Sequence, residues 1–187
     1  MNYRHAFHAG NFADLVKHGT LTLLLDALMA DAAPLTVVDT HAGAGGYDLE
    51  GELARRTGEA AQGIFRLMTA EDSPAAFDAL NAAVRRGNPG GGVRFYPGSP
   101  SLIGAALRKG DRYVACELRD DDVALLGETL APYPGAAAHQ TGSSAMAPRT
   151  TAISAEKNAA VKLLRNMRVR LPMPLTPYPS PPPKMLT

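Results

Sequence analysis

Between residues 13 and 29, apolar side chains recur at spacings of three and four, which is typical of a helix with one buried face. The residues expected on this face are Ala13, Leu15, Val16, Leu21, Leu24, Leu25, Leu28 and Met29. After Pro34 the pattern changes to a continuous run, LTVV, of aliphatic and β-branched residues, which favours a buried strand ending at Asp39. The pattern therefore predicts a helix followed by a strand.

A second apolar run, in DRYVACELRD, predicts a strand that ends at Glu117, and the following pattern predicts a helix over residues 120–130. Before it, VRFYPGSP predicts a short strand and turn, and SLIGAALRKG predicts a helix capped by Gly110. Within residues 51–92, RRTGEAAQGIFRLMTA and AAFDALNAAVRR predict two short helices, closed by the breaker run GNPGGG. Two strands that end in acidic residues and are followed by helices predict right-handed βαβ units and a parallel sheet.

The first strand leads into a glycine-rich turn, HAGAGGY, whose glycines are Gly43, Gly45 and Gly46. Glycine lets the backbone turn tightly and approach a ligand closely. Ligands of open parallel sheets bind outside the carboxyl ends of the strands, so we expect Asp39, His41 and Glu117 on one rim. A carboxylate at the end of the second strand suits the ribose hydroxyls of a dinucleotide or of S-adenosylmethionine. Asp48 occupies the sixth position of a G-x-G-x-x-G fingerprint, which disfavours the dinucleotide.

Charge is distributed unevenly along the chain. The 187 residues, 45% of them hydrophobic, suffice for one core, and the net charge is only +1. Residues 1–140 contain 12 Lys and Arg against 17 Asp and Glu, whereas residues 141–187 contain 7 against 1. The single cysteine, Cys116, fits a reducing compartment, and the start MNYRHAFHAGN has no apolar signal segment. We therefore expect a cytoplasmic protein without a membrane-spanning segment.

Five motifs occur in the same order as in a known family: MNYRHAFHAGNFADLVKH, VVDTHAGAGGYDL, RTGEAAQGI, FYPGSP and CELRDDD. As far as residues 130–140, the chain resembles the bacterial 23S ribosomal RNA adenine-N6 methyltransferases of the J type. The resemblance implies an α/β class I methyltransferase fold, with a Rossmann-like parallel sheet that is incomplete here. It divides the chain into an amino-terminal motif, helix, first strand and cofactor loop (1–50), a small helical insertion (51–92), a continuation of the Rossmann-like domain (93–140) and a divergent basic, proline-rich tail (141–187).

By this resemblance, a methyl group would pass from S-adenosylmethionine to N6 of an adenine in 23S ribosomal RNA. The residues expected to contact the cofactor are His18, His41, Ser99, Glu117 and Gly142. Tyr3 matches the family position that touches substrate RNA. We expect a monomer and no metal site, because a lone cysteine and scattered histidines do not form the closed cluster that zinc prefers.

Simpler structural roles stay open for three of these side chains. His18 could interact with a helix dipole at the end of a helical turn, and Ser99 could cap the helix that follows it. Glu117 could form a solvated ion pair with Arg119 or Arg112.

The end of the chain departs from the family pattern. Amino-group methyltransferases of this kind use a D/N-P-P-Y/F motif to hold the adenine, and the sequence lacks it; Thr141 stands where the family has an acid before Gly142. We hypothesise a carboxy-terminally truncated or frame-shifted version of the enzyme, with weak cofactor binding and methyl transfer absent or nearly so. Two other interpretations stay open: a non-catalytic RNA-binding remnant that uses the basic tail and, less favoured, a dinucleotide-binding oxidoreductase fragment.

Overall fold

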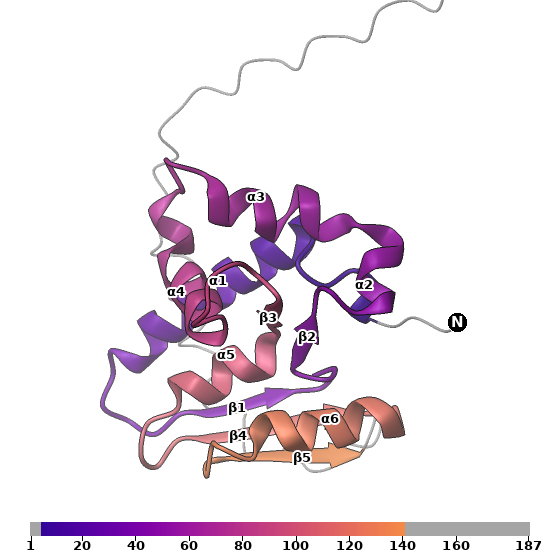
Figure 1. Ribbon diagram of the computed structural model, residues 1–187. Helices are drawn as coiled ribbons and strands as arrows, with labels where there is room; N and C mark the ends of the chain where they lie inside the picture. The colour runs from indigo at the N-terminus through magenta and orange to yellow at the C-terminus, as the bar shows by residue number, and fades with distance from the viewer. Residues whose placement is uncertain (1–4, 141–187) are drawn as a thin grey trace, which may run out of the picture. The chain divides into compact units, whose positions relative to one another are not determined.

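Three parallel strands in the order β1–β4–β5 form the main sheet of the computed structural model (Figure 1). Their bounds are β1 Thr36–Asp39, β4 Arg112–Glu117 and β5 Ala136–Gln140. Asp39 pairs with Ala115, so β4 continues beyond β1 to Glu117 at the carboxyl-terminal rim. The structure describes residues 5–140, and the expected tail, 141–187, lies outside them. The predicted α/β fold with a parallel sheet is confirmed.

A second, antiparallel sheet pairs β2 (Gly46–Asp48) with β3 (Phe95–Pro97). The sequence predicts a strand at β3 but not at β2. Tyr47 of β2 pairs with Tyr96 of β3, and both side chains are buried. The backbone N–H of Leu49 donates to the carbonyl of Arg94 at 2.8 Å, which extends the pairing. This sheet therefore brings the two ends of the segment between them close together.

That segment contains more pieces than the two helices predicted. The pieces are α2 Glu52–Thr57, η2 Glu59–Gln62, α3 Ile64–Thr69, η3 Ala75–Phe77 and α4 Asp78–Gly87, where η denotes a 3-10 helix. Gly58 ends α2 in the left-handed conformation, with φ of 64°, and its N–H donates to the carbonyl of Ala54. A residue in that conformation cannot continue a right-handed helix. RRTGEAAQGIFRLMTA is therefore divided at its glycines.

The remaining helices are η1 His5–Phe7, α1 Phe12–Met29, α5 Ser99–Ala106 and α6 Asp120–Leu130. Helix α6 has the predicted bounds and packs on β4 and β5 (Figure 1). Helix α5 ends before Gly110, which lies in the following loop with φ of 99°, so the predicted cap is wrong. None of the described helices is long and apolar enough to cross a bilayer.

Helix α1 buries only part of the face that its apolar residues predict: Leu15 and Leu25 are buried as expected, but polar residues share the buried positions. Asn11 caps the helix by accepting a hydrogen bond from the N–H of Asp14 at 2.9 Å. The buried residues of α1 are Asp14, Leu15, His18, Gly19, Thr22 and Leu25. Ala13 and Val16, both expected on the buried face, are exposed. Polar residues at positions 14, 18 and 22 thus face inward at the spacing of a helix turn.

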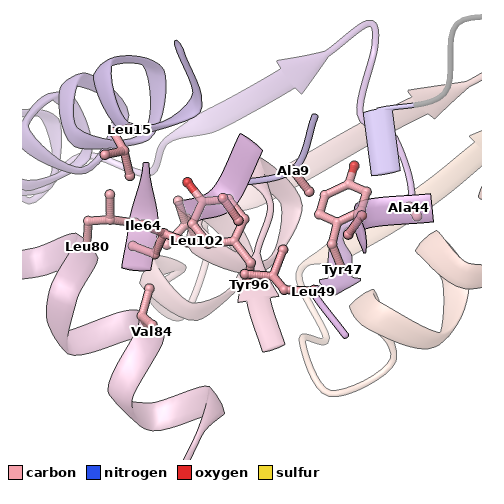
Figure 2. Close-up of a cluster of buried hydrophobic side chains, with 12 residues drawn as sticks. Ala9, Leu15, Ala44, Tyr47, Leu49, Ile64, Leu80, Val84, Tyr96 and Leu102 are labelled. Carbon is pink, nitrogen blue, oxygen red and sulfur yellow. The ribbon is translucent and has the colours of Figure 1, made fainter. Parts of the chain in front are cut away.

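Buried apolar side chains form two clusters. The first joins α1 to the insertion and to the antiparallel sheet, and includes Leu15, Tyr47, Ile64, Leu80 and Tyr96 (Figure 2). The second packs helices on the parallel sheet and includes Leu25, Ile103, Tyr113, Leu126 and Leu130. Helix α1 contributes to both clusters, so its position is fixed relative to both sheets.

Candidate functional site

A pocket of about 250 Å³ lies beside the carboxyl end of β4 and the glycine-rich turn. Its lining comprises His5, Lys17, His18, His41, Ala42, Gly43, Tyr47, Gly98, Ser99, Glu117, Arg119 and Asp122. Four side chains expected at a cofactor site, far apart in the sequence, therefore meet in one hollow. The other two expected site residues, Tyr3 and Gly142, lie outside the described residues.

Glu117 is held by backbone N–H groups. Its Oε2 accepts from Gly43 at 3.0 Å, and its Oε1 accepts from Leu118 at 2.7 Å and from Arg119 at 3.0 Å. These three backbone contacts hold the carboxylate in place. A carboxylate offers about four acceptor positions, so one position at Oε2 is left for a ligand hydroxyl.

Gly43 occupies a position that only glycine fits without strain. Its φ is 68°, and a Cβ placed on it would lie 2.6 Å from the hydroxyl oxygen of Tyr47. The preceding residue, Ala42, donates its N–H to the carbonyl of Cys116 at 2.9 Å. The glycine-rich turn is thus tied to the end of β4 by Cys116 and Glu117.

Asp39, at the end of β1, connects the turn to α5. Its Oδ1 accepts from the N–H of His41 at 3.0 Å, and its Oδ2 accepts from the hydroxyl of Ser99 at 3.4 Å. Gly98 is the residue before the first turn of α5, so the simpler role of Ser99 as helix cap is wrong. The His41 side chain is exposed, with Nδ1 2.9 Å from the hydroxyl of Thr40.

His18 is fully buried in the middle of α1, so its proposed interaction with the end of a helix is wrong. Its Nδ1 lies 2.8 Å from the hydroxyl of Tyr96, whereas its Nε2 has no partner among the described residues. Burial, assisted by the nearby charge of Lys17, lowers the pKa of His18 to about 3. The ring is therefore neutral at pH 7, and an unpartnered polar atom remains at the pocket.

Asp14 supports two residues of the pocket, and the apolar pattern missed it. Its buried carboxylate accepts from Lys17 Nζ at 2.7 Å, lies 3.0 Å from His5 Nε2, and accepts from the N–H of Gly10 at 3.0 Å. Burial raises the pKa of Asp14, but the hydrogen bond from His5 and the nearby charges outweigh it and hold the pKa well below its usual value. An anion thus positions two pocket residues, His5 and Lys17.

Tyr47 and Gly98 were also missed. The Tyr47 ring lies 5.1 Å from the His5 ring, centroid to centroid, and forms one wall of the pocket. A Cβ on Gly98 would lie 2.9 Å from the carbonyl oxygen of Gly45. The buried Tyr47 lies on β2, a strand that the sequence did not predict, so no local pattern pointed to it. Within residues 5–140, no cluster of three or more His, Cys, Asp or Glu side chains could hold a metal ion.

Comparisons with known proteins agree on one family. The family model described as "Ribosomal RNA large subunit methyltransferase D, RlmJ" matches residues 32–163. The curated protein named ribosomal RNA large subunit methyltransferase J from Escherichia coli (strain K12) is 43% identical over 126 residues, which cover 67% of this chain and 45% of that protein. The protein of the same name from Haemophilus influenzae is 37% identical over 127 residues, with the same two coverages.

A solved structure is similar as well. The crystal structure of protein LPL1258 from Legionella pneumophila aligns with a TM-score of 0.68 and 32% identity, over 74% of this chain and 51% of that one. The chain thus spans less than half the length of the two curated relatives.

Proposed function

This chain belongs to the family described as ribosomal RNA large subunit methyltransferase D, RlmJ, and from that membership we propose that it carries the S-adenosylmethionine-binding part of a ribosomal RNA methyltransferase. The acceptor in this proposal is N6 of an adenine in 23S ribosomal RNA. The observation that carries the proposal is the pocket that gathers His18, His41, Ser99 and Glu117.

The polar groups of the pocket suit this cofactor. The remaining acceptor position of Glu117 Oε2 matches a ribose hydroxyl, and the unpartnered His18 Nε2 matches a polar atom of the ligand. His41 and Ser99 stand on the same rim, next to the end of β1. The bound cofactor supplies a methyl group on a sulfonium, and transfer to an amine needs positioning rather than a covalent intermediate.

Positioning of the second substrate has less support in this chain. The sequence lacks the D/N-P-P-Y/F motif that would hold an adenine amino group. The target base would also have to be unstacked to reach the pocket. We therefore propose that the chain on its own binds the cofactor but transfers methyl groups very slowly or not at all.

Calorimetric titration with S-adenosylhomocysteine tests the proposal. We expect saturable binding by the full chain, and no binding by the double variant His41→Ala with Glu117→Ala, which removes two side chains of the rim. Glu71→Ala is the matched control, because Glu71 is exposed and remote from the pocket lining.

A second titration with NAD separates the methyltransferase from the oxidoreductase interpretation. Binding of NAD but not of S-adenosylhomocysteine would contradict the proposal. So would the absence of S-adenosylhomocysteine binding by a chain that melts cooperatively.

A further inference from the structure

We propose that Tyr96 is a positioning residue that fixes His18 in the tautomer with the proton on Nε2, so that the pocket presents one N–H donor to an acceptor atom of the bound cofactor. The role of the donor toward the cofactor rests on the proposed function. The tautomer itself does not, because it is a property of the ligand-free protein.

The two side chains come from elements far apart in the sequence. His18 lies on α1 and Tyr96 on β3, and both are fully buried. Their ring centroids lie 5.5 Å apart with the planes tilted by 36°, and the His18 Nδ1 to Tyr96 Oη distance is 2.8 Å. Tyr96 lies in the middle of β3 and packs in the first apolar cluster (Figure 2). Its hydroxyl therefore has a fixed position.

The direction of this hydrogen bond follows from the partners that each group has. Tyr96 Oη makes no second hydrogen bond among the described residues. If His18 donated from Nδ1, the phenolic hydrogen would be buried without an acceptor, which destabilises the fold. If Tyr96 donates, Nδ1 is the acceptor, and the single proton of the neutral ring lies on Nε2. The second arrangement leaves only Nε2–H without a partner.

The ionisation of both groups is consistent with this arrangement. Burial raises the pKa of the Tyr96 phenol well above its usual value, so the hydroxyl keeps its proton. Burial likewise keeps His18 neutral at pH 7, and a neutral imidazole has one donor and one acceptor nitrogen.

The chemistry of the ligand atom follows from the tautomer. A buried N–H donor without a protein partner favours a ligand that supplies an acceptor, and disfavours one that supplies a second donor. Lys17, a cation, lines the same pocket beside His18. Two parts of the cofactor offer acceptors: the carboxylate of its amino-acid part, and the oxygens and ring nitrogens of its nucleoside part.

Nitrogen-15 NMR of the histidine rings in the ligand-free protein tests the tautomer directly, because the two ring nitrogens shift differently with and without a proton. We expect His18 to carry its proton on Nε2 at pH 7. In Tyr96→Phe the ring loses its fixed donor, so its signals should move toward a mixture of tautomers. Tyr133→Phe is the control, since this half-buried phenol lines a pocket that contains no residue of the candidate site.

The binding measurement then connects the tautomer to the ligand. Tyr96→Phe should weaken S-adenosylhomocysteine binding about tenfold, the effect of one misdirected hydrogen bond. 5′-Methylthioadenosine, which lacks the amino-acid part, locates the acceptor. If the acceptor is the carboxylate, Tyr96→Phe weakens only S-adenosylhomocysteine; if it is in the nucleoside, both ligands lose affinity equally.

Two results would overturn the proposal. One is a wild-type His18 with its proton on Nδ1, a test that needs no variant to fold. The other is a folded Tyr96→Phe variant with unchanged ring signals and unchanged affinity. If His18 carries its proton on Nε2 and its signals move in Tyr96→Phe, but the protein binds no S-adenosylhomocysteine, the result would support the positioning role of Tyr96 and contradict the proposed function.

Discussion

The two ends of the parallel sheet use buried and half-buried polar groups in opposite ways. At the amino end, the Arg108 guanidinium donates to the Asp111 carboxylate and to the carbonyls of Met29, Asp31 and Ala33, so each of its nitrogens is used. Asp111 in turn accepts from the backbone N–H groups of Leu35 and Arg108, and the hydrogen bond from Arg108 holds the pKa of Asp111 well below its usual value.

At the carboxyl end, the polar groups are only partly used. Among the described residues, His18 Nε2 has no partner and Glu117 Oε2 accepts only from Gly43. An unpartnered buried polar group costs free energy, and a bound ligand that supplies the partner removes that cost. We call the amino end saturated, because its polar groups have partners within the fold, and the carboxyl end unsaturated. The saturated end joins loops of the fold, and the unsaturated end is suited to binding a ligand.

The largest effect is expected at the saturated end. Asp111→Ala leaves Arg108 Nε and two backbone N–H groups without their acceptor and removes the buried partner of the guanidinium charge, so the free energy of unfolding should fall by about 2–4 kcal/mol. S-adenosylhomocysteine affinity of the folded fraction should not change. Urea unfolding, followed by titration below the transition, measures both quantities.

Arg94→Ala is the control, because it removes an exposed ion pair with Asp48 and should cost less than about 1 kcal/mol. Equal decreases in the free energy of unfolding of the Arg94 and Asp111 variants would contradict the distinction between a saturated buried group and a surface ion pair.

The next effect is a pH dependence that originates at the unsaturated end. The folded pKa of His18, about 3, lies below its ordinary value of 6.5. Between these values the unfolded chain binds a proton that the folded chain does not, so stability is complete above pH 6.5 and falls as the pH decreases. The slope contributed by His18 approaches about 1.4 kcal/mol per pH unit.

Unfolding free energies measured from pH 7 to pH 5 check this, because most carboxylates stay ionised over that range. His18→Asn keeps a polar atom near Tyr96 without a titrating ring, so its stability should fall less with decreasing pH. Parallel curves for wild type and variant would show that another group titrates.

A smaller effect separates two glycines with the same backbone conformation. Gly43→Ala adds a Cβ that would lie 2.6 Å from Tyr47 Oη, whereas Gly58→Ala adds one with nothing within 4 Å, and their φ values are 68° and 64°. Both variants strain the backbone by about 1 kcal/mol. Only Gly43→Ala should add a steric cost and lose S-adenosylhomocysteine binding, which thermal melting with and without the ligand would reveal.

The same contrast explains which parts of the molecule could be predicted. The strands β1 and β4 and the helix α6 follow from local apolar runs and from an acidic first turn, which are properties of neighbouring residues. The strand β2 has three residues, and its partner β3 is far away along the chain, so no local pattern indicates it. Its absence from the prediction also concealed the wall formed by Tyr47.

The buried face of α1 shows the second limit. Counting apolar residues placed Ala13 and Val16 inside, but Asp14 and His18 take the buried positions because Lys17, His5 and Tyr96 satisfy them. The position of His18 in the pocket came from a family motif; its tautomer depends on a partner 78 residues away. Contacts of that kind follow from the assembled fold and not from the pattern along the chain.

The smallest expected effect concerns the connection between the glycine-rich turn and β4. Glu117→Gln keeps the shape of the side chain and an oxygen that can accept from Leu118 and Arg119, but it directs an N–H donor at the N–H of Gly43. The free energy of unfolding should fall by about 1 kcal/mol, and S-adenosylhomocysteine should bind about tenfold more weakly. Calorimetry beside Glu71→Gln, an exposed control, measures the difference. Unchanged affinity would mean that the carboxylate at the end of β4 only supports the turn, and that the ligand finds its acceptors elsewhere on the rim.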